Sequence, residues 1–234
     1  MADKNDVVRP YSRVAGLLAL LTCLLASRLA ATEVTGTVVL EKSTFRKTVG
    51  PTVYDMRGMT ASPTQLKQEA GPFHRVAVWL EPSETVSVAP GTATMRQSGR
   101  HFDPDFIVVP VGSKIDFPNL DPIFHNIFSL SRSQTFDLGY YSEGKSRSVI
   151  FSHPGVVQVY CHIHPGMYGV IVVTPTVWSA VPSNDGSFGW TNIPPGQYRL
   201  NVWQKTGGLV KKRLNVPASG TVHMTVALPD ESDQ

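Results

Sequence analysis

Hydrophobic and polar residues alternate along most of this chain in short runs, a pattern that predicts β-strands rather than helices. The runs are rich in β-branched and aromatic residues and are separated by Gly, Pro, Asn and Asp, which form turns. Only residues 64–70 show a weak helical pattern. Many short strands between such turns are typical of β-sandwiches, so the sequence predicts an all-β fold.

The strand-like runs fall into three blocks. Residues 32–91 hold two strong runs, separated by a stretch without periodicity that is long for a loop in a compact domain. Residues 92–174 hold six runs, which suit a Greek-key sandwich. Residues 175–229 hold four more and predict a second, smaller β unit of immunoglobulin or transthyretin type, followed by an acidic tail at 230–234. The candidate strands are 34–40, 75–82, 106–109, 114–117, 125–129, 146–151, 156–160, 168–173, 187–190, 197–203, 209–216 and 221–228. The pattern leaves open whether the first and third blocks form one sandwich or two.

The first 31 residues differ in composition from the rest of the chain. Basic residues precede an apolar run at 14–26, and small residues follow at 29–31. The run is shorter than the roughly 20 apolar residues that a membrane-spanning helix needs. Residues 1–31 therefore read as a secretory signal peptide, with an uncleaved membrane anchor as the alternative. We expect a periplasmic or secreted protein without a stable membrane span in its mature form.

Removal of this leader changes both the charge and the cysteine content. The full chain has 21 Lys and Arg, 18 Asp and Glu and a net charge of +3, whereas residues 32–234 keep 17 and 16, a net charge of +1. No basic stripe with interleaved aromatic residues occurs, which argues against a nucleic-acid partner. Cys23 leaves with the leader, and Cys161 remains as a single thiol. It could stay buried and inert, form an intermolecular disulfide, become oxidised, or bind a metal.

The neighbours of Cys161 favour the metal. Residues 160–167 read YCHIHPGM, with one thiol, two imidazoles and one thioether. Soft ligands of this kind select copper over hard cations, and two His and one Cys in a plane with a weak axial Met form the blue-copper electron-transfer site. Cys161, His164 and Met167 are spaced three residues apart, so one tight loop can direct all three inward. His162 is expected to point away.

A second imidazole must come from elsewhere in the chain. His125 stands at the start of a candidate strand, 36 residues before Cys161. A Greek-key sandwich can bring two such distant strands side by side. His125 is therefore the candidate for the remaining position in the ligand plane.

With these residues, the segment 92–174 resembles a cupredoxin, the small blue-copper fold of plastocyanin, pseudoazurin and amicyanin. The resemblance is carried by the pair His125-Asn126 and by the short Cys-x2-His-x2-Met loop, which is similar to that of amicyanin. It implies one type 1 copper, with Asn126 beside the site, bonding across to the ligand loop and stiffening it. The ligands that it implies are His125, Cys161, His164 and Met167.

The wider pattern is similar to a group of bacterial secreted proteins often labelled methylamine-utilisation or plastocyanin-like proteins. The matching stretches are 117–119, 125–129, 136–140 and 161–167. Proteins of this group often carry a carboxypeptidase-regulatory-like β domain, and the stretch 194–200 matches it. The resemblance implies such a domain at 175–229. The label of the group does not establish a substrate.

A multicopper oxidase is excluded by the number of histidines. His162-Ile163-His164 is similar to the His-x-His motifs that bind a trinuclear copper cluster, but such a cluster needs several of these motifs and the sequence has one. The seven His are at positions 74, 101, 125, 153, 162, 164 and 223. Paired catalytic carboxylates and Ser-His-Asp spacing are also missing from the sequence. We therefore expect a protein that is not an enzyme.

The leading hypothesis is a type 1 copper protein that carries single electrons between redox partners, such as a c-type cytochrome or a dehydrogenase. His164 would be the exit for the electron, and the residues beside it would form an apolar rim for docking: Pro165, Gly166 and Tyr168. Copper sequestration or delivery is the first alternative, motivated by the extra His162. A copper-free β-sandwich binding module is the second.

Overall fold

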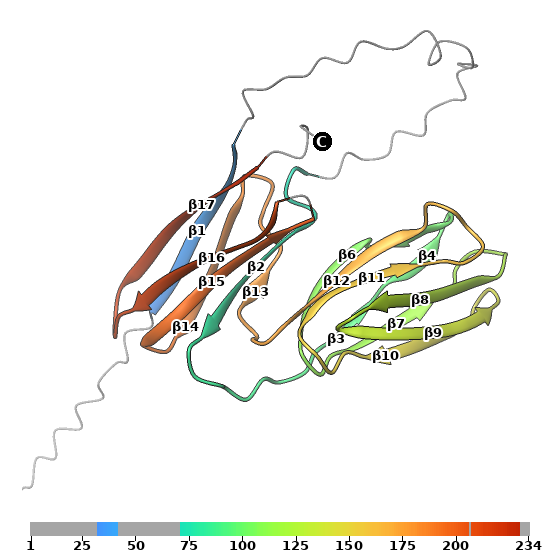
Figure 1. Ribbon diagram of the computed structural model, residues 1–234, viewed down its shortest axis with the longest axis horizontal. Coiled ribbons are helices and arrows are strands. Elements are labelled where there is room, and N and C mark those ends of the chain that lie inside the picture. The colour runs from blue at the N-terminus through green and yellow to red at the C-terminus, as the bar shows by residue number, and fades with distance from the viewer. Residues whose placement is uncertain (1–31, 42–70, 206, 230–234) are drawn as a thin grey trace, which may run out of the picture.

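The computed structural model describes residues 32–41, 71–205 and 207–229 (Figure 1). The leader, the weak helical pattern at 64–70, most of the aperiodic stretch and the acidic tail lie outside these residues. The elements of the described part are all β-strands, which confirms the predicted all-β fold. No helix there is long and apolar enough to cross a membrane.

The described residues form seventeen strands. They are β1 (Thr32–Glu41), β2 (Val76–Pro82), β3 (Thr92–Thr94), β4 (Arg96–Ser98), β5 (His101–Asp103), β6 (Phe106–Pro110), β7 (Lys114–Pro118), β8 (His125–Ser131), β9 (Gln134–Tyr141), β10 (Ser146–Ile150), β11 (Gly155–Tyr160), β12 (Tyr168–Thr174), β13 (Ser179–Ala180), β14 (Ser187–Ile193), β15 (Gly196–Gln204), β16 (Gly208–Val216) and β17 (Thr221–Pro229). Each of the twelve predicted strands is present, with ends within three residues of the prediction. The sequence pattern did not predict β3, β4, β5, β9 and β13.

Strands β3 to β12 form one sandwich, which we call the site-bearing sandwich (Figure 1). A five-stranded sheet in the order β6-β12-β11-β8-β9 packs on a three-stranded sheet in the order β10-β7-β3, and β4 pairs with β5. The core between the sheets includes Ile115, Phe117, Ile127, Phe151 and Ile171, all fully buried. The chain crosses repeatedly between the two sheets, as expected for a Greek-key sandwich.

The remaining strands, which come from both ends of the described chain, form the second sandwich. Its sheets have the orders β14-β1-β17 and β13-β2-β15-β16. Strand β1 pairs antiparallel with β14 and parallel with β17, and β2 pairs antiparallel with β15. The strands of the first and third sequence blocks therefore share one sandwich, around a core that includes Val38, Leu80, Leu200 and Val226.

A third apolar cluster joins the two sandwiches, and we call it the junction. It contains Ala77 and Trp79 of β2, and Phe106, Val170 and Val172 of β6 and β12. Both β2 and β12 are thus covered on both faces, which explains why each is a nearly continuous apolar run rather than an alternating one. Figure 1 shows the two sandwiches side by side, with β2 and β12 on the sides that face each other.

Candidate metal centre

The alternation of strand β11 determines which side of the sheet each residue of the YCHIHPGM stretch faces. Val157, Val159 and Cys161 point into the core of the site-bearing sandwich. Side chains of successive residues point to opposite faces of a strand, so Tyr160 and His162 point to the outer face. Cys161 is 8% exposed and is a free thiol. Cys161 continues the inward-facing alternation of β11, so its thiol lies at the end of the core.

Strand pairing brings His125 to the same end of the sandwich. Strands β8 and β11 are antiparallel neighbours, with Tyr160 opposite Phe128. Counted from this pair, Cys161 lies opposite Ile127, and His125 lies two residues further along β8 on the same face of the sheet. His125 is fully buried there. A separation of 36 residues in sequence becomes a direct side-chain contact.

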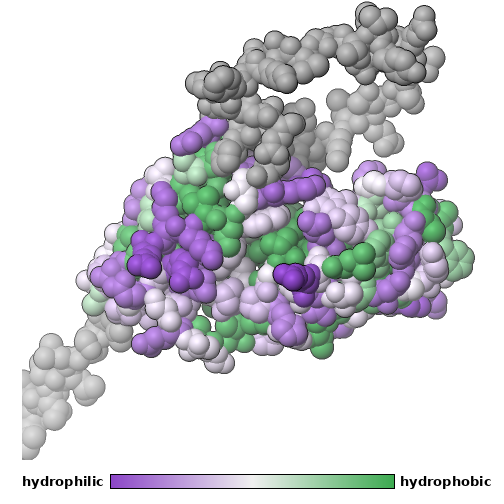
Figure 2. All heavy atoms as spheres, in the orientation of Figure 1, coloured by the Kyte–Doolittle hydropathy of each residue, from purple (hydrophilic) through white to green (hydrophobic). Residues whose placement is uncertain are grey.

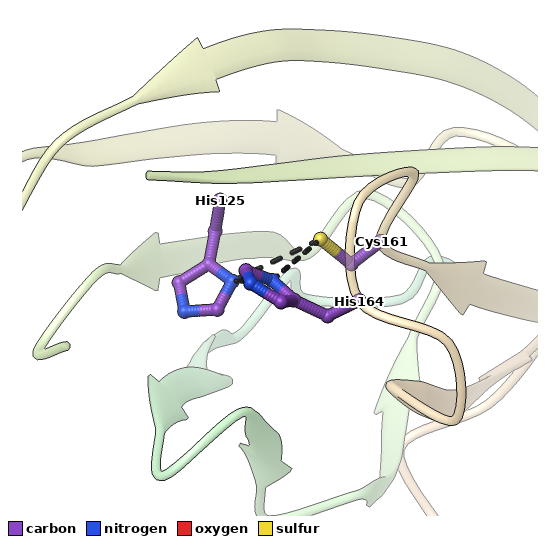
Figure 3. Close-up of side chains that lie close together, drawn as sticks. All are labelled: His125, Cys161 and His164. Atoms are coloured by element: carbon purple, nitrogen blue, oxygen red, sulfur yellow. Dashed lines mark hydrogen bonds between the residues drawn. The ribbon is translucent and has the colours of Figure 1, made fainter. Parts of the chain in front are cut away.

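Three donor atoms converge at this end (Figure 3). The Sγ atom of Cys161 lies 3.8 Å from Nδ1 of His125 and 3.6 Å from Nδ1 of His164. The two Nδ1 atoms lie 2.9 Å apart. Among the described residues, this is the one group of three or more His, Cys, Asp and Glu whose ligand atoms lie within 4.8 Å of one another.

The separations suit a shared metal ion. Nitrogen and sulfur ligands bind an ion such as zinc or copper at about 2.0–2.3 Å. Ligands in one trigonal plane around such an ion are therefore roughly 3.5–3.8 Å apart. The two sulfur–nitrogen distances, 3.8 and 3.6 Å, fit that range. The nitrogen–nitrogen distance of 2.9 Å is shorter than that range and fits a hydrogen bond between the two rings. One thiolate and two imidazoles are a donor set for copper or zinc.

Asp121 fixes the orientation of the His125 ring. Its Oδ2 lies 2.8 Å from Nε2 of His125, and both side chains are buried. The carboxylate accepts a hydrogen bond from the N–H at Nε2, so the proton of the neutral ring stays on that nitrogen. The lone pair of Nδ1 is then directed at Cys161 and His164. Carboxylate–histidine pairs of this kind are common behind metal-binding histidines. Asp121 is therefore a residue of the site that does not itself reach the three donor atoms.

The turn between β4 and β5 holds Asp121 in place. The backbone N–H groups of Gly99 and Arg100 donate to its two carboxylate oxygens, at 2.6 and 2.9 Å. Burial alone would raise the pKa of Asp121, but these bonds and the His125 ring outweigh it, so the pKa lies below its usual value. The sequence alone assigned no role to Asp121. Its position four residues before His125 was the available signal.

His164 lies at the edge of the site, partly exposed to solvent. Burial is the largest influence on its pKa and lowers it, and the neighbouring His125 ring and the positive charge of Arg100 lower it further. The neutral ring is therefore favoured, which is the form that binds a metal.

Met167, the expected axial ligand, lies at the end of the loop. It is 2% exposed and belongs to the same apolar cluster as Cys161. Its backbone N–H donates to the carbonyl of His164 at 3.2 Å, which closes the turn of the loop. Three of the four expected ligands thus form one donor group, and Met167 ends the loop that carries two of them.

Asn126 contacts a different partner from the one that the resemblance implied. Its Nδ2 donates to Oδ1 of Asp137 in β9 at 2.5 Å, rather than to the ligand loop. Its Oδ1 is buried and has no hydrogen-bond partner among the described residues. Asp137 also accepts the backbone N–H of Gly139 at 2.8 Å. The bonds from Gly139 and Asn126 hold the pKa of Asp137 below its usual value.

His162 makes its contacts on the outer face. Its ring stacks on Phe128, with centroids 3.9 Å apart and planes at 19°. Its Nε2 lies 3.6 Å from Oδ2 of Asp137, within ion-pair distance when the ring is protonated. His162 is not part of the donor group.

The three residues expected at the docking rim lie in different surroundings. Pro165 and Gly166 are exposed beside His164. Tyr168 is partly buried at the edge of the junction, where Lys205 and Arg75 of the second sandwich lie over its ring at 4.4 and 5.9 Å from the centroid. Burial raises the pKa of Tyr168.

The other histidines lie apart from the donor group. His74 and His101 contact the carbonyl oxygens of Gly71 and Gly99 through Nδ1, and His223 contacts Thr35. His153 is exposed in the turn before β11.

No family model matches this sequence, and no curated protein matches it. Solved structures do resemble part of it. A Cu-containing nitrite reductase from Thermus scotoductus SA-01 is 26% identical, with a TM-score of 0.34 over 35% of this chain and 22% of that protein, so the match spans less than a quarter of that relative. A purple cupredoxin from Nitrosopumilus maritimus is 24% identical over 35% of this chain and 99% of its own, with a TM-score of 0.33. A reduced amicyanin variant is 19% identical over 41% of this chain and 99% of its own, with a TM-score of 0.33.

Proposed function

We propose that this protein binds one type 1 copper and carries single electrons between redox partners. The observation that carries the proposal is the convergence of His125 Nδ1, Cys161 Sγ and His164 Nδ1 at the end of one β-sandwich. Together with the buried Met167, these residues supply the two-His, one-Cys and axial-Met set of blue-copper sites. Copper bound there would supply a one-electron couple between Cu(II) and Cu(I).

The fold supports rapid electron transfer because it holds the ligands before the metal binds. His125 is fixed by Asp121, and Cys161 by the core pattern of β11. Ligands that cannot move far keep a similar arrangement in both oxidation states, which lowers the structural cost of each transfer. Met167 would tune the potential from the axial side.

Exposed hydrophobic side chains occur in the two segments that carry the site residues. Ile163 is 43% exposed in the same loop, and Leu120 and Phe124, in the segment before β8, are 51% and 57% exposed. Hydrophobic side chains reach the surface at this end of the site-bearing sandwich in Figure 2. Together with Pro165 and Gly166, they suit a small, transient contact with a redox protein such as a c-type cytochrome or a dehydrogenase. The electron would leave through His164, and Tyr168 would border this surface from the junction.

The single donor group favours one-electron transfer over the chemistry of a multicopper oxidase. A trinuclear cluster would need a second set of histidines, and the described residues contain no further group of metal-binding side chains. We also propose that residues 92–174 are the copper-binding domain, that 175–229 belong to a carboxypeptidase-regulatory-like unit, and that 1–31 direct the protein to the periplasm or outside the cell.

The absorption spectrum of the copper-loaded protein tests the proposal. The Cu(II) form should absorb intensely at about 600 nm, and its potential should be reversible. Cys161→Ser should abolish this band because the thiolate is the source of the charge transfer, whereas His153→Ala, at an exposed histidine away from the site, should leave it unchanged. A colourless Cu(II) adduct of the wild-type protein, or colour that survives Cys161→Ser, would refute the proposal.

A further inference from the structure

One carboxylate connects the two chain segments that carry the proposed copper ligands. Asn126 directly follows His125 in β8, and His162 directly follows Cys161 in the ligand loop. Asp137 of β9 lies between them: Oδ1 accepts a hydrogen bond from Asn126 at 2.5 Å, and Oδ2 faces the His162 ring at 3.6 Å. Residues next to a ligand on each segment are thus joined through a single side chain.

The His162 ring makes the second attachment of the loop. It stacks on Phe128 of β8 at 3.9 Å between centroids. Residues 163, 165 and 166 are exposed. Apart from His164, His162 is the one side chain of residues 162–166 that hydrogen-bonds, pairs or stacks with another element of the described structure.

We propose that Asp137 and His162 are positioning residues that act as a latch, holding the ligand loop against β8 and β9 and slowing the loss of copper. The inference rests on the proposed function, since it assumes that copper is bound by the loop and by His125. For copper to leave, the donor atoms of the loop must separate from His125, and that movement pulls His162 away from Asp137 and Phe128. Neither latch residue reaches the donor atoms, so the latch alters the rate of release and not the ligand set.

Three variants separate the contributions of the latch. Asp137→Asn keeps an oxygen for Asn126 and Gly139 but removes the charge that faces His162. His162→Phe keeps a ring on Phe128 but removes the contact with Asp137, and His162→Ala removes both contacts. His153→Ala is the matched control, because it removes an exposed histidine of the same sandwich that is no part of the latch.

The first measurement is the release of Cu(I) from the reduced protein to a Cu(I)-selective chelator. Asp137→Asn and His162→Phe should each release copper about threefold faster than the wild type, the range expected when one exposed contact to a charged side chain is lost. His162→Ala should be about tenfold faster, since an aromatic stack is lost as well. The double variant with both Asp137→Asn and His162→Phe should be no faster than either single variant, because both remove the same interaction. The Cu(II) absorption spectrum should not change.

The second measurement uses the copper-free protein. Amide hydrogen exchange of residues 161–167, followed by mass spectrometry, should rise in the same order of variants, while exchange in the second sandwich stays unchanged. If the wild-type protein binds no copper, the proposed function is refuted. The exchange experiment then still tests whether Asp137 and His162 hold the loop. Equal exchange and equal release in all variants would overturn the latch. An altered Cu(II) spectrum in His162→Ala would also overturn it, because His162 would then be a ligand.

Discussion

Asp121 is the residue with the largest expected influence on the proposed copper beyond the ligands themselves. It is buried, it carries a negative charge, and it contacts the far nitrogen of His125 at 2.8 Å. Two backbone N–H groups hold the carboxylate, so the charge cannot turn away from the ring. A fixed negative charge beside a ligand stabilises Cu(II) more than Cu(I) and so lowers the reduction potential.

Asp121→Asn is therefore expected to raise the reduction potential of the copper site. Loss of such a partner behind a metal ligand typically changes metal affinity by about 10- to 100-fold. If the site loses affinity for Cu(II) and not for Cu(I), the potential rises by roughly 60–120 mV. A one-electron couple shifts by about 59 mV for each tenfold change in the ratio of the two affinities. Cyclic voltammetry measures the shift. Asp116→Asn removes the same charge at a partly exposed position in β7 and should move the potential little. Equal shifts in both variants would contradict the role assigned to Asp121.

At the scale of the elements, the strands and turns that the sequence predicted are those with strong local signals. The turn at Asn184, Asp185 and Gly186 precedes β14 as expected, and Gly186 has a φ of +82°. Its N–H donates to Ser183, and its carbonyl accepts from Val38 of β1. A Cβ on Gly186 would overlap the backbone oxygen of Val38, so the turn depends on this glycine both for its dihedral angles and for its close approach.

Gly186→Ala should lower the free energy of unfolding by about 3 kcal/mol, because backbone strain adds to the overlap with Val38. Gly208→Ala separates the two causes, since Gly208 has a φ of +70° but no atom within 4 Å of its would-be Cβ. That control should cost only the strain of the left-handed conformation, about 1 kcal/mol. Urea denaturation followed by tryptophan fluorescence measures both. Equal losses would mean that the close approach contributes nothing.

The strands that the sequence did not predict lack such local signals. Strand β9 contains Asp137 and Gly139, residues that normally mark turns, and its pairing with β8 overrides that preference. The three-residue strands β3, β4 and β5 are too short to show a period. At the candidate site, the spacing of Cys161, His164 and Met167 was readable, but the roles of Asp121 and Asp137 depend on tertiary contacts that no local pattern encodes.

At the scale of the whole molecule, the junction makes one body of two sandwiches. Four sheets follow one another in order, with the two central sheets packed through Trp79, Val170 and Val172. At one edge of the junction, Arg75 pairs with Asp105, and Arg75 and Lys205 lie over Tyr168. Tyr168 directly follows Met167, so the second sandwich braces the end of the ligand loop. This contact connects the stability of the second sandwich to the geometry of the candidate site.

The junction should make the two sandwiches unfold together. All four tryptophans, at positions 79, 178, 190 and 203, lie outside residues 92–174, so fluorescence reports on the second sandwich and on its side of the junction. Hydrogen exchange in β8 and β11 reports on the site-bearing sandwich. In a urea titration of the wild type, both signals should change at the same midpoint, because separation would expose an apolar cluster whose five central residues are each at most 8% exposed.

Removing side chains from the junction should separate the two transitions. Val170→Ala combined with Val172→Ala deletes buried methyl groups from the face of β12 that contacts the second sandwich, at a cost of about 2–4 kcal/mol. These groups contribute little to the core of either sandwich. Their removal should therefore weaken the contact between the sandwiches more than either sandwich itself, and the two midpoints should differ. Val39→Ala, at a valine that is 39% exposed in β1, should leave them coincident. Coincident midpoints in the double variant would show that the sandwiches are coupled by contacts other than the apolar junction.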